Sequence, residues 1–210
     1  MDLTSSDLEI CDDGGTNQYV GVRFDNISIP PGSTINTSYI QFSSDDNDTT
    51  ALTVTITGID ADDTPTFTTT NNNISDRIDG DITSGTTATV TWNPSSWNNN
   101  DILAAQQTPS LNAIVQEIVD RGGWSLGNAM GFVLTSPSTN ERRTDTWDHD
   151  PNLAPTLHVE FTLPTPTPTA EEIPAGANWR YLDDGSDQGT AWTASAFDDS
   201  SWSYGIAELG

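Results

Sequence analysis

Apolar and polar side chains alternate along much of the chain, which is the pattern of β-strands that bury one face. Residues 20–24 carry apolar side chains at every second position, and in residues 52–57 Leu, Val and Ile alternate with Thr. Residues 19–42 read as strand, turn and strand, with Pro30-Pro31-Gly32 as the break. The same reasoning predicts strands at residues 8–11, 51–59, 88–92, 129–135, 142–147 and 156–161.

One segment has helical rather than strand periodicity, and it predicts an α-helix over about 109–121. Thr108 can cap its start, Pro109 fits the first helical position, and Gly122-Gly123 end it. Its apolar residues fall at i, i+3, i+4, i+7 and i+8, namely Leu111, Ile114, Val115, Ile118 and Val119. We therefore expect a mostly β, jelly-roll-like antiparallel β-sandwich with this single helix packed across it.

The organisation of the chain changes at LPTPTPTA, residues 163–170, where alternating Pro predicts an extended, semi-rigid linker. Residues 1–162 form the expected sandwich module. Residues 171–210 form a short β-type segment with three Trp and few aliphatic residues, too little for an adequate core of its own.

The charge of the chain excludes some partners. There are 31 acidic residues against six basic ones, all of them Arg, and the formal net charge is −25. Such a charge repels nucleic acid and anionic membranes and favours cations and neutral ligands. No apolar run is long enough to insert into a membrane. The single cysteine, Cys11, allows no intrachain disulfide, so we expect a buried thiol or, as the alternative, an intermolecular bond.

Six segments spread over residues 3–162 resemble the DNRLRE-type carbohydrate-binding modules of large secreted bacterial proteins. They are LTSSDLE (3–9), YVGVRFDNISIPPGSTI (19–35), GIDADD (58–63), TPSLNAIVQEIVDRGGW (108–124), GNAMGFVLT (127–135) and APTLHVEF (154–161). The resemblance implies a non-catalytic jelly-roll sandwich, located outside the cell or on its surface, appended to polysaccharide-active enzymes or adhesins. The ligand is not implied, since it varies within the family.

Two departures from the resemblance concern the ends of the modules. Comparable modules carry a further acidic strand ahead of LTSSDLE. The segment WRYLDDGSDQGTAW…FDDSSW after the linker resembles the opening of a galactose-binding-like domain, and the sequence stops before most of that domain. Either the sequence is incomplete, or the tail of one chain completes a sheet of the next.

Acidic clusters are the candidate metal sites, because calcium prefers carboxylate, amide and carbonyl oxygens. The first choice is the set that flanks Trp147 in TDTWDHD, and the second follows the predicted strand that ends at Ile59. We expect a structural calcium ion at one of these sets: Asp145, Asp148 and Asp150, or Asp60, Asp62 and Asp63. Asp183, Asp184 and Asp187 form a third set. For each cluster the alternative is an acidic loop facing water.

Trp147 and Trp97 are the candidate carbohydrate contacts, since an indole ring packs on the apolar face of a pyranose. Arg142 and Arg143 could meet an acidic sugar. The alternative is that the Trp residues close the sandwich and that the arginines pair with the many acids.

No nucleophile–base pair or zinc motif appears, and both histidines fit structural or surface roles, so we do not expect an enzyme. The leading hypothesis is a calcium-stabilised, extracellular, non-catalytic module that binds polysaccharide or mediates adhesion. The alternative is a self-assembling subunit of a filament or surface layer, in which residues 163–210 pack on a neighbouring copy.

Overall fold

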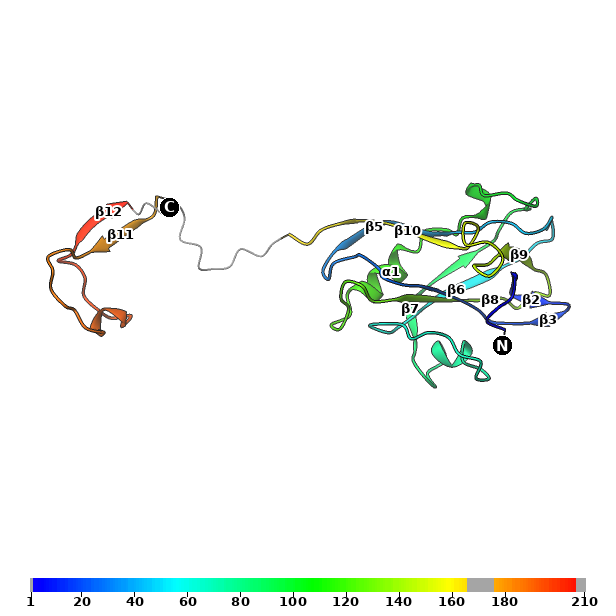
Figure 1. Cartoon of the computed structure of the whole chain (residues 1–210), viewed down its shortest axis with the longest axis horizontal. Helices are drawn as coiled ribbons and strands as arrows, with labels where there is room; N and C mark the ends of the chain where they lie inside the picture. The colour runs from blue at the N-terminus through cyan, green and yellow to red at the C-terminus, as the bar shows by residue number, and fades with distance from the viewer. Residues whose placement is uncertain (1, 166–175, 207–210) are drawn as a thin grey trace. The chain divides into compact units, whose positions relative to one another are not determined.

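The alternating pattern folds into antiparallel β-strands, accompanied by one α-helix among the described residues (Figure 1). The structure is a computed structural model and describes residues 2–165 and 176–206. The prediction of a mostly β, antiparallel fold with one helix is confirmed. The chain divides into two units, Met1–Pro164 and Thr165–Gly210. Residues 166–170 of the predicted linker lie outside the described part.

The first unit contains strands β1 to β10 and the helix α1. The strands are β1 (Asp7–Ile10), β2 (Asp12–Asp13), β3 (Thr16–Asn17), β4 (Val20–Phe24), β5 (Thr34–Gln41), β6 (Val54–Ile59), β7 (Gly85–Trp92), β8 (Met130–Thr135), β9 (Arg142–Asp145) and β10 (Thr156–Thr162). The helix α1 is Asn112–Val119, and two short 3-10 helices are Ser75–Arg77 and Ala104–Gln106.

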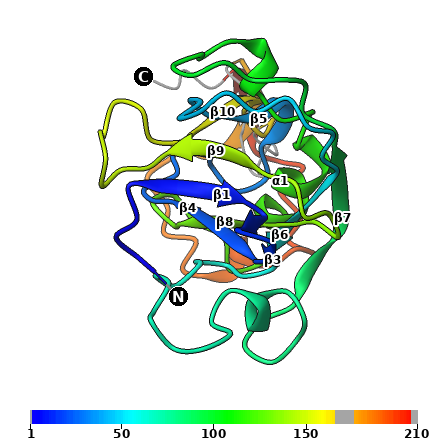
Figure 2. The same cartoon turned by 90° about the vertical axis from the view of Figure 1, so that its right-hand side faces the viewer.

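The core lies between two groups of strands, so the arrangement is sandwich-like. One group is a four-stranded sheet in the order β4-β8-β6-β7, and the other contains the pairs β5–β10 and β1–β9. A bridge between Ser44 and Thr144 connects the segment after β5 to β9. Figure 2 shows β5 and β10 above the core and β4, β8 and β6 below it. Ile10, Ile40 and Phe132, from both groups, are fully buried in one cluster.

The two strands predicted within residues 19–42 form, but they do not pair with each other. β4 pairs with β8, and β5 pairs with β10. Residues 25–33 therefore carry the chain from one sheet to the other. Gly32, with φ +76, makes the turn that the Pro-Pro-Gly sequence predicted.

The helix is shorter than predicted at its start. Thr108, expected to cap it, instead lies alongside β5: its hydroxyl accepts a hydrogen bond from the Ile40 N–H, and its own N–H donates to the Ile40 carbonyl. The N–H of Leu111 donates to the Ser38 carbonyl of the same strand, so the helix begins only at Asn112. The predicted apolar stripe is buried throughout, and α1 packs against β5, β6 and β7.

Gly58 of β6 allows this close packing of the helix. A Cβ atom at Gly58 would lie 2.5 Å from Ile114 Cγ2 of the helix and 2.9 Å from Thr86 Cγ2. Both distances are shorter than van der Waals contact, so only glycine fits between the sheet and the helix at this position.

The second unit is a small two-stranded structure. β11 (Asn178–Tyr181) pairs with β12 (Ser203–Ile206), and a short 3-10 helix spans Ala191–Thr193. None of the described residues 176–206 is buried. A two-stranded hairpin without a core is marginally stable by itself.

Candidate functional site

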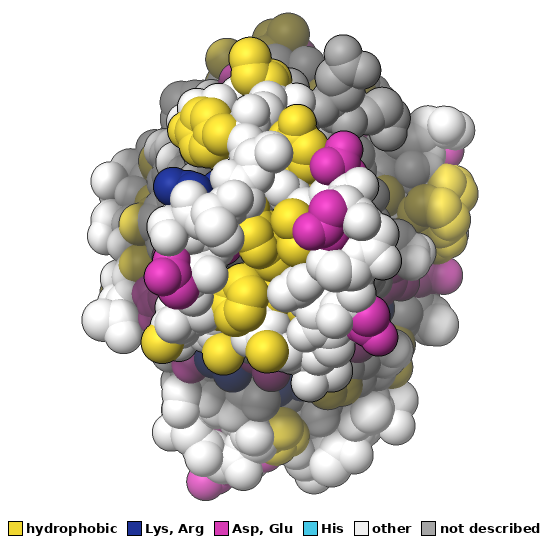
Figure 3. All heavy atoms as spheres, turned by 90° about the vertical axis from the view of Figure 1, so that its left-hand side faces the viewer, with side chains coloured by type: hydrophobic (Ala, Val, Ile, Leu, Met, Phe, Trp, Pro, Cys, Tyr) yellow, Lys and Arg dark blue, Asp and Glu magenta, His cyan; other side chains and the backbone are white. Residues whose placement is uncertain are grey.

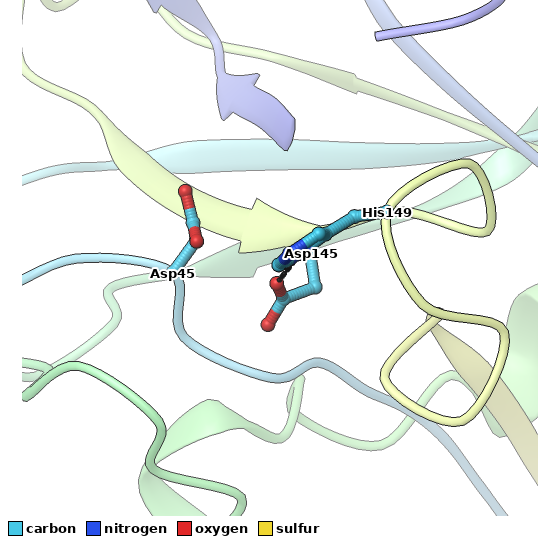
Figure 4. Close-up of side chains that lie close together, drawn as sticks. All are labelled: Asp45, Asp145 and His149. Atoms are coloured by element: carbon cyan, nitrogen blue, oxygen red, sulfur yellow. Dashed lines mark hydrogen bonds and ion pairs between the residues drawn. The ribbon is translucent and has the colours of Figure 1, made fainter. Parts of the chain in front are cut away.

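Three titratable side chains meet at the end of β9. Asp145 is the last residue of that strand, and His149 lies in the turn that follows it. Asp45 comes from the loop after β5 and is held there because its N–H donates to the Arg143 carbonyl. His149 Nδ1 lies 2.5 Å from Asp145 Oδ1, and Figure 4 shows Asp45 to the left of this pair, with no hydrogen bond drawn to it. One ligand atom from each residue lies within 4.8 Å of the others.

Burial differs sharply within this cluster. The Asp145 side chain is 3% exposed, whereas that of His149 is 49% exposed. The hydrogen bond with Asp145, together with the negative charges of Asp145, Asp45 and Asp150, raises the pKa of His149. Partial burial, together with the neighbouring charges of Asp145 and Asp7, raises the pKa of Asp45. The cluster therefore favours a positive charge between its carboxylates, whether a proton on His149 or a metal ion.

A second acidic cluster lies in the loop before β7. Carboxylate oxygens of Asp76, Asp79 and Asp81 lie within 4.8 Å of one another. Gly80, with φ +104, makes the turn between the last two residues. Arg77 points away from them and donates instead to the carbonyls of Pro65, Thr66 and Asn73. No ion pair between described residues involves any of the three carboxylates.

The two clusters suit different ions. Asp76, Asp79 and Asp81 offer only oxygen atoms, the ligands that calcium prefers. Asp45, Asp145 and His149 add an imidazole nitrogen, which is typical of zinc and other transition-metal sites rather than calcium sites. Both clusters have residues that could hold a metal ion.

The structure does not bring the predicted metal ligands together. Of the first-choice set, only Asp145 belongs to a cluster. Asp150 is half-buried and accepts hydrogen bonds from the backbone and side chain of Asn152, and Asp148 lies at a groove described below.

The carboxylates of the second-choice set have partners within the protein, and their role as metal ligands stays a prediction. Asp60 and Asp62 both form ion pairs with Arg121, which follows the helix, with 2.7 Å between Arg121 Nε and Asp62 Oδ1. Asp63 accepts a hydrogen bond of 2.8 Å from the Ala129 N–H. These contacts tie the end of β6 to the segments around α1 and β8.

Five of the six cluster residues were not among the predicted metal ligands. Asp45, Asp76, Asp79 and Asp81 were not singled out from the sequence, and His149 was expected only in a structural or surface role. The sequence Asp79-Gly80-Asp81 was the available signal, since a glycine between two Asp residues predicts a tight turn that converges their carboxylates.

The predicted ligand-binding residues separate into exposed and buried ones. Trp147 is 68% exposed, whereas Trp97 is 0% exposed and donates from Nε1 to the Ala105 carbonyl. Arg142 is also buried, and its guanidinium donates only to backbone carbonyls. The expectation of ligand contact is therefore corrected for Trp97 and Arg142. Arg143 is half-buried and forms ion pairs with Asp46 and Glu141.

Trp147 lies at a groove on the surface of the first unit. The groove has a volume of about 790 Å³ and is bordered by β4, the N-terminal segment, the turn 146–148 and the start of β10. Its apolar lining includes Phe24, Phe67 and Leu157. A smaller groove of about 220 Å³ shares Leu157 and lies along Val159 and Phe161 of β10.

The turn that carries Trp147 is fixed at both ends. The Thr146 hydroxyl donates to the Ser5 carbonyl at 2.6 Å, and the Thr146 N–H donates to the Ser6 carbonyl. On the other side of Trp147, His149 contacts Asp145. The contact between Asp145 and His149 and the exposed indole therefore belong to the same turn.

Cys11 is buried, and burial raises the pKa of its thiol to about 12. In the described part of the chain, no helix has the length and apolar character needed to cross a membrane. Comparisons of the chain with protein-family models, with curated protein sequences and with solved structures found no significant match, so the interpretation of function depends on the site.

Proposed function

We propose that the chain is a non-catalytic, extracellular module that binds polysaccharide in the groove beside Trp147 and is stabilised by calcium. The observation that carries the proposal is the 68% exposed indole of Trp147 at the mouth of a groove of about 790 Å³. Sugar rings stack on exposed indole rings, and exposed apolar surface continuous with a groove is typical of ligand-binding sites.

The composition of the groove supports a sugar ligand. Phe24, Phe67 and Leu157 supply apolar area, while Asp25 and Asp148 supply acceptors for hydroxyl groups. Ligand sites commonly combine a mostly apolar lining with a few polar groups that fix orientation. The rigid turn around Trp147 reduces the conformational entropy that binding would cost.

Calcium enters this proposal as a structural ion. The loop with Asp76, Asp79 and Asp81 concentrates three carboxylates without a basic partner in the described residues, and their mutual repulsion would be relieved by a divalent cation. The ion would fix the loop that precedes β7.

The test replaces Trp147 with alanine and measures retention on a broad glycan array and on immobilised polysaccharides, with calcium present. Loss of one stacked indole should weaken binding about tenfold, the equivalent of about 1.4 kcal/mol. Trp192→Ala is the matched control, since Trp192 is 55% exposed in the second unit. If the chain retains no glycan, or if both variants bind as the parent does, the proposed function is wrong.

A second proposed function, self-assembly into a filament or surface layer, is supported by the second unit. Trp179, Tyr181, Tyr204 and Ile206 of its two strands are all exposed, and Figure 3 shows hydrophobic side chains gathered on the near face of this unit. Trp179→Ser with Tyr204→Ser should abolish ordered assemblies seen by negative-stain microscopy with calcium present. Assemblies that survive both changes would exclude this role for residues 165–210.

A further inference from the structure

We propose that the groove beside Trp147 selects polysaccharides that carry free amino groups, such as polymers of glucosamine, and rejects polymers of uronic acids. This inference rests on the proposed polysaccharide binding and adds the chemical class of the ligand. Three observations support it: the charge of the groove, the partners of Arg23, which is the basic residue in its lining, and the geometry around Trp147.

The groove lining is negatively charged. Three carboxylates, those of Asp2, Asp25 and Asp148, line it, together with one guanidinium, that of Arg23. Arg23 is already engaged, since Nη1 forms an ion pair with Asp25 and Nε donates to the Thr64 carbonyl at 2.6 Å. The charged groups left to meet a ligand are therefore carboxylates, which accept hydrogen bonds and attract cations.

The residues around the groove make its electrostatic potential more negative. Asp150 lies in the same turn as Trp147 and is half-buried, while His149 is committed to Asp145 by their hydrogen bond. Arg142 and Arg143, the two arginines nearest in sequence, are buried or paired with acids and do not supply a site for a uronate. With a net charge of −25 on the whole chain, a polyanionic ligand would be repelled at long range as well.

Trp147 and Asp148 together form a recognisable site for an amino sugar. An exposed indole binds the apolar face of a pyranose and also attracts an ammonium group placed over its ring. The carboxylate of Asp148, adjacent in sequence and lining the same groove, can pair with that ammonium. A neutral sugar would make the stacking contact alone, and a basic peptide would make the charge contact without the pyranose stacking.

The experiment is isothermal titration of the full chain with four probes: tetramers of glucosamine, N-acetylglucosamine and a hexuronic acid, and tetralysine. It is run with calcium present at about pH 5.5, where the glucosamine amines are protonated. We expect the glucosamine tetramer to bind about tenfold more tightly than its N-acetylated form, with the uronate weakest. Asp148→Asn should reduce this ratio about threefold to fivefold, and Asp187→Asn, the same charge change in the second unit, should not.

The outcomes separate this inference from the proposed function. Equal binding of the glucosamine and N-acetylglucosamine tetramers, lost in Trp147→Ala, would overturn the charge selection and leave polysaccharide binding intact. Tightest binding of the uronate would also overturn it. A further outcome is that tetralysine binds as tightly as the glucosamine tetramer while Trp147→Ala binds both probes as the parent does. That result would show only a general attraction of cations and would overturn the inference. Absence of binding by all sugars would contradict the proposed function itself.

Discussion

Replacing Arg142 with methionine is expected to destabilise the first unit far more than the same change at its neighbour, Arg143. Arg142 is 1% exposed, and its guanidinium has no carboxylate partner. It donates instead to four backbone carbonyls, those of Thr50, Pro94, Ser95 and Glu141, at distances of 2.6 to 3.3 Å. These contacts hold together the loop before β6, the loop after β7 and the segment that leads into β9.

The magnitude follows from the carbonyls that lose their donor. Methionine fills much of the space but donates no hydrogen bond, and each buried carbonyl without a partner costs about 1–3 kcal/mol. With water reaching some of the four, we expect the free energy of unfolding to fall by about 3–5 kcal/mol, as when one partner of a buried charged contact is removed. Arg143 forms its ion pairs at half-exposed positions, where loss of the pair costs about 0–1 kcal/mol.

The assay is urea unfolding followed by tryptophan fluorescence, with the slope of free energy against urea compared among the parent and the two variants. An unchanged slope assigns the shift in midpoint to stability rather than to a more compact unfolded state. Equal destabilisation by the two variants, or none at Arg142, would refute the reasoning that the buried guanidinium organises these loops.

Three further predictions concern calcium, pH and packing. Calcium at a hundred times its dissociation constant should stabilise the first unit by about 2.7 kcal/mol, and Asp79→Asn should weaken this gain in a thermal melt; an equal gain in both proteins would exclude the loop as the site. Because the pKa of His149 is raised in the folded state, its contact with Asp145 adds stability that is fully present below the unfolded pKa of about 6.5 and is lost as the pH rises through the higher folded value. His149→Gln should thus lower the melting temperature more at low pH than at high pH, and a difference independent of pH would contradict the linkage. Gly58→Ala should cost about 1–3 kcal/mol in urea unfolding, since its methyl group would overlap Ile114; a neutral effect would show that the helix can move away from β6.

The strands were predictable because alternation is a local property of the sequence. In β6, Val54 and Ile56 point into the core and their Thr neighbours do not, as the pattern requires. The start of the helix was not predictable, because Thr108 and Pro109 satisfy the rules for a helix start. The competing contact with Ile40 of β5 decides the outcome, and its partner lies far away in the sequence. The pairing of β4 with β8 and of β5 with β10 depends on long-range contacts in the same way.

At the candidate site, too, the sequence shows which residue types are present but not which of them are exposed. Trp97 and Trp147 both stand in loops rich in Asn and Asp, and nothing local distinguishes them. Trp97 is covered because it pairs with Asp48 across a β-bridge and packs against Trp92, with 6.0 Å between ring centroids. Trp147 stays exposed because the Asp145–His149 contact closes its turn and leaves the indole at the groove. The sequence supplies two equivalent aromatic side chains, and only the tertiary contacts leave one of them free to meet a ligand.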